Sequence, residues 1–151
     1  DYGLLSNSYF VSENFNYDFT IREPLLDINF SNREAILKEF AHFSFQLHEN
    51  NILHLDYSPG NILIKKDEDK FIYKVVDINR MEFKKLSLNQ RLENLSMLWA
   101  KDEDMKIIAI EYARLSNQDE ANCIKLAIKF SQKHKDRKNF KKRLKGKKVV
   151  D

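Results

Sequence analysis

The chain has 151 residues, of which 42% are hydrophobic, 12% aromatic and 32% charged, a composition that supplies one hydrophobic core and excludes wholesale disorder. Three glycines and one cysteine exclude a glycine-rich phosphate loop, a disulfide framework and a zinc site built on cysteines. The formal net charge is +3, but residues 131–151 carry ten lysines and arginines against two aspartates, a net of +8, so residues 1–130 carry −5.

Aromatic and β-branched residues between positions 4 and 19, among them residues 9–11, predict one or two N-terminal strands. Ser31 and Glu34 then form a capping-box pattern that predicts the start of a helix ending near Glu49. The buried stripe of this helix consists of apolar residues three or four positions apart: Ile36, Phe40, Phe43 and Leu47.

A β-hairpin is predicted after this helix. Residues 52–54 are a short apolar approach to a polar loop, and residues 62–64 begin the first strand of the hairpin. The charged residues 66–70 predict a turn, and residues 71–76, which are β-branched and aromatic, predict the returning strand.

The pattern is helical from Ser87 onward. Residues 87–90 form a second capping box, and apolar residues at helical spacing continue from there to Trp99. A third stripe, formed by Met105, Ile108, Tyr112 and Leu115, predicts another helix, and Asn117 with Glu120 predicts the cap of a last one. Cys123 is interpreted as a small buried hydrophobic residue. His42 and His48 have no partners at metal-ligand spacing, which disfavours metal binding by these histidines.

The loop between the first helix and the hairpin carries the residues of chemical interest. Asp56 follows His54 by two positions and precedes Asn61 by five, and the returning strand of the hairpin ends in Asp77. This is the order of parts used for phosphoryl transfer, in which a carboxylate receives the proton of the acceptor hydroxyl and hard oxygen ligands bind Mg²⁺. Turn-forming roles for these residues, with Asp77 paired to Arg80 at the surface, are the alternative.

The loop and the Asp-x-x-Arg element at residues 77–80 resemble the lipopolysaccharide kinase (Kdo/WaaP) family of the protein-kinase-like superfamily. The resemblance covers residues 9–99 and is strongest over residues 52–80. It implies an α+β fold: the C-terminal lobe of a protein-kinase-like enzyme, mainly helical, with a small hairpin at the catalytic site. It also implies ATP-dependent phosphorylation of a sugar hydroxyl, on Kdo or heptose, in the lipopolysaccharide inner core.

The resemblance implies a role for each site residue. Asp56 would be the catalytic base, held in a loop that His54 supports, and Asn61 and Asp77 would bind Mg²⁺ and thereby ATP. Arg80 would orient the metal-binding carboxylate or meet phosphate. Glu13 would lie near the hinge that meets adenine.

Two alternatives stay open. The loop also resembles small-molecule kinases of the aminoglycoside and choline type, and a non-catalytic, pseudokinase-like binding module would retain the same fold. Only about ten positions separate Asp77 from Ser87, which disfavours a protein substrate. The sequence starts at Asp1 without the phosphate-binding elements of an N-terminal lobe, so we expect this stretch alone to turn over little.

The charge distribution divides the chain at residue 130, with a basic C-terminal helix or tail over residues 131–151. The resemblance implies that residues 1–130 form the kinase-like catalytic domain, with the hinge strand at its start. The tail can attract anionic lipid or substrate phosphates. Only Phe140 supplies an aromatic ring there, so no nucleic-acid partner is expected. No apolar run approaches the roughly 20 residues of a membrane span, and we expect a cytoplasmic protein, peripheral at most to the inner membrane.

Overall fold

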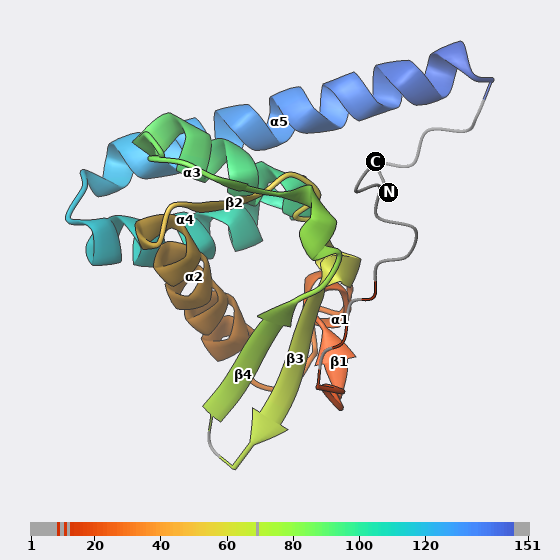
Figure 1. The fold of residues 1–151 in the computed structure, drawn as a ribbon. Coiled ribbons are helices and arrows are strands. Elements are labelled where there is room, and N and C mark those ends of the chain that lie inside the picture. The colour runs from red at the N-terminus through yellow and green to blue at the C-terminus, as the bar shows by residue number, and fades with distance from the viewer. Residues whose placement is uncertain (1–8, 10, 12, 69, 147–151) are drawn as a thin grey trace, which may run out of the picture.

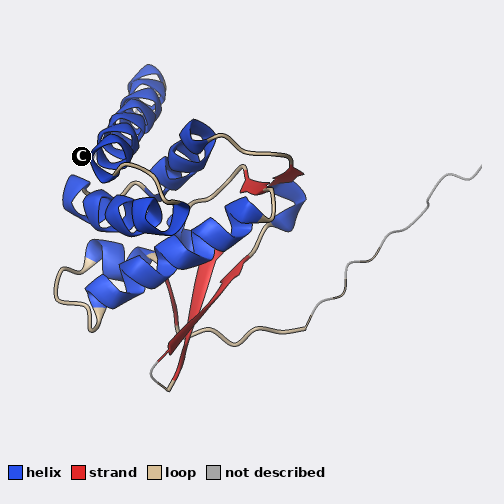
Figure 2. Cartoon of the chain, turned by 90° about the vertical axis from the view of Figure 1, so that its left-hand side faces the viewer, coloured by secondary structure: helices blue, strands red, loops and turns tan. Residues whose placement is uncertain are grey.

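The computed structural model describes residues 9, 11, 13–68 and 70–146 and has an α+β architecture in which helices predominate. Figure 1 shows the helices gathered into one body, with a long hairpin projecting from it, and Figure 2 shows the same arrangement from the side. The helices are α1 (Arg22–Leu26), α2 (Arg33–Glu49), α3 (Leu88–Leu95), α4 (Asp102–Ser116) and α5 (Glu120–Leu144). The strands are β1 (Phe19–Thr20), β2 (Ile52–His54), β3 (Ile62–Asp67), β4 (Lys70–Val75) and β5 (Met81–Phe83).

The strands form two small antiparallel sheets, and the strands of the two sheets are interleaved along the chain. The first has the strand order β1-β3-β4, and in the β3–β4 hairpin Ile62 pairs with Val75 and Asp67 with Lys70. The second joins β2 to β5, with His54 opposite Met81. The hairpin therefore forms where the alternation of the sequence predicts it, and its register carries the chain back to the end of β2.

The hydrophobic core lies where α2, α3, α4 and the start of α5 meet. Its largest wholly buried side chains include Phe40, Leu92, Ile108 and Tyr112. Truncating one such side chain to alanine typically costs about 2–5 kcal/mol, because the removed contacts leave a cavity. This core fixes the positions of β2 and of the loop that follows it.

The two predicted capping boxes have different outcomes. At Ser87 both halves are present: its hydroxyl accepts from the Gln90 amide, and the Gln90 side chain accepts from the Ser87 amide. The capping box predicted at Ser31 is wrong, because α2 begins after Asn32, which adopts the left-handed conformation with φ 57° and makes no side-chain cap bond. The predicted end near Glu49 is confirmed.

Three further expectations are corrected. Tyr9 and Val11 are exposed and lie outside any strand, Phe10 lies outside the described residues, and the N-terminal strand is β1 instead. The helix predicted to reach Trp99 ends at Leu95, because a 3₁₀ turn follows and Trp99 turns to φ 57°.

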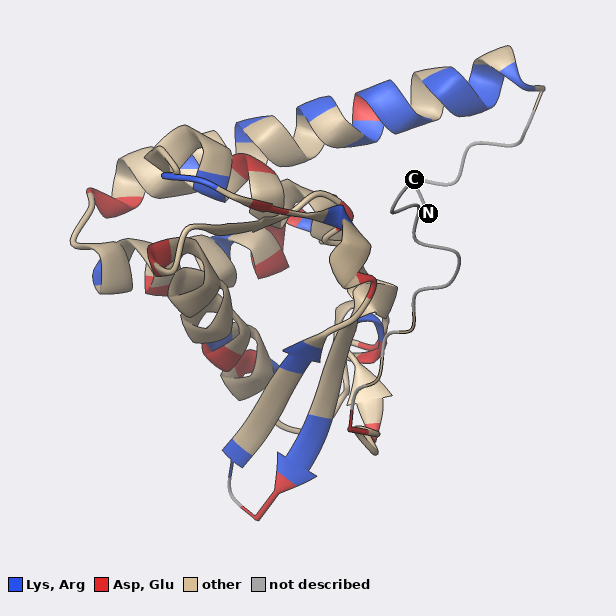
Figure 3. Ribbon diagram, in the orientation of Figure 1, with Lys and Arg blue, Asp and Glu red and all other residues tan. Residues whose placement is uncertain are grey.

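Asn117, predicted to cap the last helix, instead ends α4 in the left-handed conformation, and Asp119 caps α5 by accepting from the amide of Asn122. Helix α5 continues without a break across residues 130 and 131, and the division into two regions there stays a prediction. Figure 3 shows lysines and arginines along its C-terminal half. In the described part of the chain, every helix is too short or too polar to cross a membrane.

Candidate functional site

The loop that joins β2 to β3 is held between buried side chains. His54 is 1% exposed and Tyr57 is wholly buried, with its hydroxyl 2.9 Å from the Ser44 hydroxyl. Burial raises the pKa of the Tyr57 hydroxyl, which therefore stays neutral. Between the buried His54 and Tyr57 the chain exposes Leu55 and Asp56, and the Asp56 side chain is 42% exposed.

His54 links this loop to the end of β4. The amide of Asp56 donates to His54 Nδ1 at 3.1 Å, so that nitrogen carries no proton. The other ring nitrogen, Nε2, then carries the proton and donates to the carbonyl of Val76 at 2.8 Å. One neutral imidazole thus connects the backbone of Asp56 to the residue that precedes Asp77.

Asn61 makes the second connection between the same two segments. Its Nδ2 donates to the carbonyl of Asp56 at 2.9 Å, which closes the loop across the Pro59–Asn61 3₁₀ turn. The backbone carbonyl of Asn61 accepts from the amide of Val76 at 3.0 Å. Because the side-chain carboxamide uses Nδ2 for the bond to Asp56, its other polar atom is the oxygen Oδ1. Figure 1 shows the turns after β2 and β4 next to each other.

Asp77 and Arg80 complete the cluster. Asp77 adopts the left-handed conformation with φ 64°, a region that aspartate tolerates better than most residues. Arg80 Nη1 lies 3.9 Å from Asp56 Oδ2, and Arg80 Nε lies 3.9 Å from Asp77 Oδ2. The carbonyl of Arg80 also accepts from the amide of Leu55 at 2.8 Å. One guanidinium therefore faces two carboxylates that are 21 positions apart in the sequence.

The structure thus brings together five of the six predicted site residues: His54, Asp56, Asn61, Asp77 and Arg80. The sixth, Glu13, does not join this cluster. Glu13 is exposed in the segment before β1, and in the described part of the chain no hydrogen bond or ion pair joins it to the loop. Its location near an adenine hinge stays a prediction.

A buried network behind the loop was missed by the sequence analysis. Asn94 Nδ2 donates to the carbonyl of His54 at 2.9 Å, and Asn94 Oδ1 lies 3.1 Å from His48 Nε2. His48 Nδ1 lies 2.8 Å from the hydroxyl of Tyr112. Because Asn94 Oδ1 can only accept, His48 donates to it from Nε2 and accepts from Tyr112 at Nδ1. Burial lowers the pKa of His48 to about 4 and raises that of Tyr112 to about 12.

This network anchors the backbone of the 54–61 loop from α2, α3 and α4 at once. Nothing in the local sequence distinguishes His48 or Asn94 from a solvent-facing helix residue, since both are polar and their partners are more than 40 positions away. The interpretation of Cys123 as a buried apolar residue is confirmed, and burial raises the pKa of its thiol.

The donor set of the site fits Mg²⁺ bound together with phosphate. Among the described residues no group of three histidine, cysteine, aspartate or glutamate side chains could hold a metal by itself. Mg²⁺ is ordinarily held by one or two carboxylates, with substrate phosphates and water completing the octahedron. The carboxylate of Asp77 and the carboxamide oxygen of Asn61 are hard ligands of that kind, on adjoining segments.

A scan against protein-family models matches residues 25–124 to the lipopolysaccharide kinase (Kdo/WaaP) family. The match covers about two thirds of the 151 residues and contains the whole 54–61 loop and Asp77. A search of curated proteins found no match.

Proposed function

Because the chain belongs to the lipopolysaccharide kinase (Kdo/WaaP) family, we propose that it transfers the γ-phosphoryl group of ATP to a sugar hydroxyl of the lipopolysaccharide inner core. The fold would then be the C-terminal lobe of a protein-kinase-like enzyme. The observation that carries the proposal is that Asn61 hydrogen-bonds the backbone of Asp56, while Arg80 faces the carboxylates of both Asp56 and Asp77.

Each residue has a definite task in this proposal. The exposed carboxylate of Asp56 orients the acceptor hydroxyl and receives its proton. Asn61 and Asp77 hold Mg²⁺, which when bound neutralises charge on the β- and γ-phosphates. Arg80 balances the two carboxylates and can meet a phosphate oxygen, and His54 keeps the loop in position through its two hydrogen bonds.

The short connection between Asp77 and α3 supports a small or lipid-linked acceptor. After Asp77 the chain forms a 3₁₀ turn and β5, and residues 84–86 alone separate β5 from the cap of α3. A segment this short cannot form the long loop on which regulated protein kinases lay a peptide substrate. A small-molecule kinase of the aminoglycoside or choline type shares this feature and is the competing assignment.

Attraction to an anionic surface is a second element of the proposal. Lysines and arginines lie along the C-terminal half of α5 (Figure 3), and most of them are exposed. A lysine or arginine near an anionic membrane contributes about 1 kcal/mol. Co-sedimentation with anionic vesicles at low salt, lost in high salt and with neutral vesicles, is the expected result; equal binding to both kinds of vesicle would contradict it.

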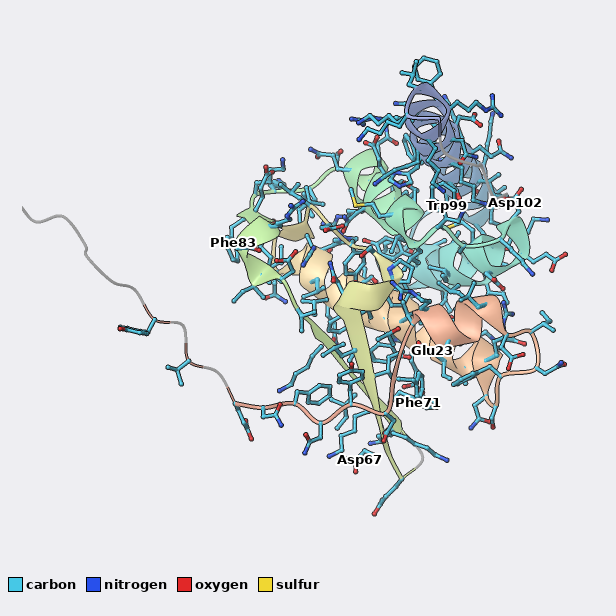
Figure 4. All side chains as sticks on the ribbon, turned by 90° about the vertical axis from the view of Figure 1, so that its right-hand side faces the viewer. Glu23, Asp67, Phe71, Phe83, Trp99 and Asp102 are labelled. Atoms are coloured by element: carbon cyan, nitrogen blue, oxygen red, sulfur yellow. The ribbon has the colours of Figure 1, made fainter. Side chains whose placement is uncertain are left out.

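The test of function is phosphoryl transfer by the complete protein with Asp56→Asn. The acceptors are core oligosaccharide, choline and an aminoglycoside, each with labelled ATP. Loss of a positioned base lowers transfer by about 10²–10⁴-fold. Asp67→Asn is the matched control, because Asp67 is an exposed aspartate at the tip of the hairpin, as Figure 4 shows, away from the loop.

Transfer to the oligosaccharide that falls with Asp56→Asn and not with Asp67→Asn supports the proposal. Unchanged turnover of Asp56→Asn would remove Asp56 from the mechanism. Transfer to choline or the aminoglycoside alone would favour the small-molecule kinase.

A further inference from the structure

A cavity of about 670 Å³ lies between α1, α5 and the segment that follows α3. Pro59 lines it, three positions after Asp56 and two before Asn61. The cavity therefore reaches the loop that carries the proposed catalytic base, from the side of α1. The cavity volume exceeds that of a monosaccharide, so one sugar unit can enter while the next sugar unit of an oligosaccharide stays outside. We call it the Trp99 pocket.

The charge of the Trp99 pocket favours an anion. Four cationic side chains line it: Arg22, Lys101, Lys135 and Lys142. The acidic lining residue is Asp136, and Asp102 nearby lies 3.9 Å from Lys135. The cations thus exceed the acids even when both aspartates are counted, and they come from three separate segments of the chain.

Trp99 gives the pocket an aromatic wall. Its left-handed conformation, φ 57°, is uncommon for a bulky residue and turns the chain sharply after the 3₁₀ turn that ends at Leu98. Lys142 Nζ lies 5.1 Å from the centroid of the ring, which places the ring beside the basic half of α5. Figure 4 shows Trp99 below α5 and close to Asp102. Aromatic walls with a few polar groups are typical of sites that bind small polar ligands.

Asn139 supplies a polar group without a partner. Its Oδ1 is buried, and within the described residues no hydrogen-bond donor reaches it. Buried polar atoms are almost always hydrogen-bonded, so this one calls for an explanation. A sugar hydroxyl donating into the pocket would satisfy it.

From these features we infer that the Trp99 pocket binds an anionic sugar, one that carries a carboxylate or phosphate, as the acceptor of phosphoryl transfer. That the bound sugar is the phosphoryl acceptor rests on the proposed function, whereas binding of the sugar rests on the pocket alone. Trp99 packs against the apolar face of the ring, the cations bind the acidic substituent, and Asn139 accepts from a hydroxyl.

The opposite face of α5 provides a matched control. A second cavity, of about 430 Å³, lies there, and its cationic lining residues are Lys84, Lys133, Arg137, Lys138 and Lys141. It has one more lysine or arginine than the Trp99 pocket and reaches the same loop at Leu55, but neither Trp99 nor Asn139 lines it. Removing two lysines from either face changes the net charge of α5 equally, so a general attraction of anions to the helix would respond to both pairs alike.

The binding experiment uses the fluorescence of Trp99, the only tryptophan of the sequence. The full chain is titrated with free Kdo, which carries a carboxylate, with glucose as a neutral sugar and with inorganic phosphate as an anion without a ring. We expect a saturable change with Kdo, with a midpoint at least tenfold lower than for either reference. Lys135→Ala with Lys142→Ala should raise this midpoint at least tenfold, and Lys138→Ala with Lys141→Ala less than twofold.

Asn139→Leu separates binding from folding. Replacing a partly buried amide whose oxygen has no partner with an apolar group of similar size leaves stability unchanged or raises it, whereas it removes the acceptor for the sugar hydroxyl. We therefore expect a thermal midpoint no lower than that of the wild type, together with a severalfold weaker response to Kdo.

In the binding experiment the inference would be overturned by a Kdo response no stronger than that of phosphate, by equal effects of the two lysine pairs, or by a Kdo titration midpoint that is unchanged in Asn139→Leu. The KM for the acceptor in the complete protein then separates the two proposals. A KM that rises only in the Lys138→Ala, Lys141→Ala variant would also overturn the inference. Saturable Kdo binding without phosphoryl transfer would instead overturn the proposed function, and sugar binding by the Trp99 pocket would stay supported.

Discussion

The buried imidazole of His48 makes the stability of the protein depend on pH in a range where few other groups titrate. His48 is 1% exposed and uses both ring nitrogens, donating to Asn94 and accepting from Tyr112. A proton added at Nδ1 would face the hydroxyl proton of Tyr112 in a site without solvent. Burial, the main cause, and the nearby charge of Arg91 lower the pKa of His48, whereas Asn94 and Glu49 act in the opposite direction.

The size of the effect follows from the two pKa values. In the folded protein the pKa of His48 is about 4, and its ordinary value is 6.5. The unfolded chain therefore binds a proton more readily, and the free energy of unfolding falls as pH falls from 6.5 toward 4. Between pH 7 and pH 5 the loss is about 2 kcal/mol, and it approaches about 3 kcal/mol below pH 4.

The assay is urea unfolding of the full chain at pH 7 and pH 5, compared with that of His48→Gln. The substitution removes the titrating group, so the variant should lose about 2 kcal/mol less than the wild type between the two pH values. Gln46→Ala is the control: Gln46 lies on the same helix, is exposed and has no titrating side chain, and this variant should keep the wild-type dependence. Equal pH dependence in wild type and His48→Gln would refute the buried, neutral histidine.

Two further predictions concern the cap of α3 and the metal-binding carboxylate. Ser87→Ala removes a complete capping box and should lower the free energy of unfolding by about 1 kcal/mol. Ser31→Ala, at the capping box that does not form, should change the free energy of unfolding by less than about 0.5 kcal/mol. Urea unfolding of both variants checks this, and equal losses would contradict the cap assignment. Asp77→Asn in the complete protein should abolish most of the Mg²⁺ dependence of ATP binding, measured by calorimetry with and without Mg²⁺. Wild-type affinity that is equal under both conditions would count against a magnesium site.

The features that the sequence predicted correctly are those encoded over short distances. Helix α2 follows from an apolar stripe at helical spacing, and the β3–β4 hairpin follows from two strand-like runs around a charged turn. The meeting of Asp56 with Asn61 follows from a five-residue turn, and the return of Asp77 follows from the hairpin register. In each case a few neighbouring residues determine the geometry.

The features that the sequence did not reveal depend on contacts between distant segments. Trp99 adopts the left-handed conformation, which the tertiary structure selects against the preference of a bulky residue. Asn32 also adopts it, at the position where α2 begins in place of the predicted Ser31 cap. The anchoring of the loop by Asn94 needs α2 and α4 to bring His48 and Tyr112 together. The Trp99 pocket likewise exists only because α5 crosses beside α1 and the 59–61 turn.

The most direct measurement replaces Mg²⁺ with paramagnetic Mn²⁺. The side-chain amide signals of asparagine are recorded by NMR as Mn²⁺ and ATP are added to the complete protein. The Asn61 signal should broaden first, at substoichiometric Mn²⁺, because this carboxamide would contact the ion. Asn117, at the turn between α4 and α5, which Figure 1 shows at the other end of the helical body, should stay sharp. Broadening that spares Asn61 while ATP is bound would contradict a metal–nucleotide site formed by Asp56, Asn61 and Asp77.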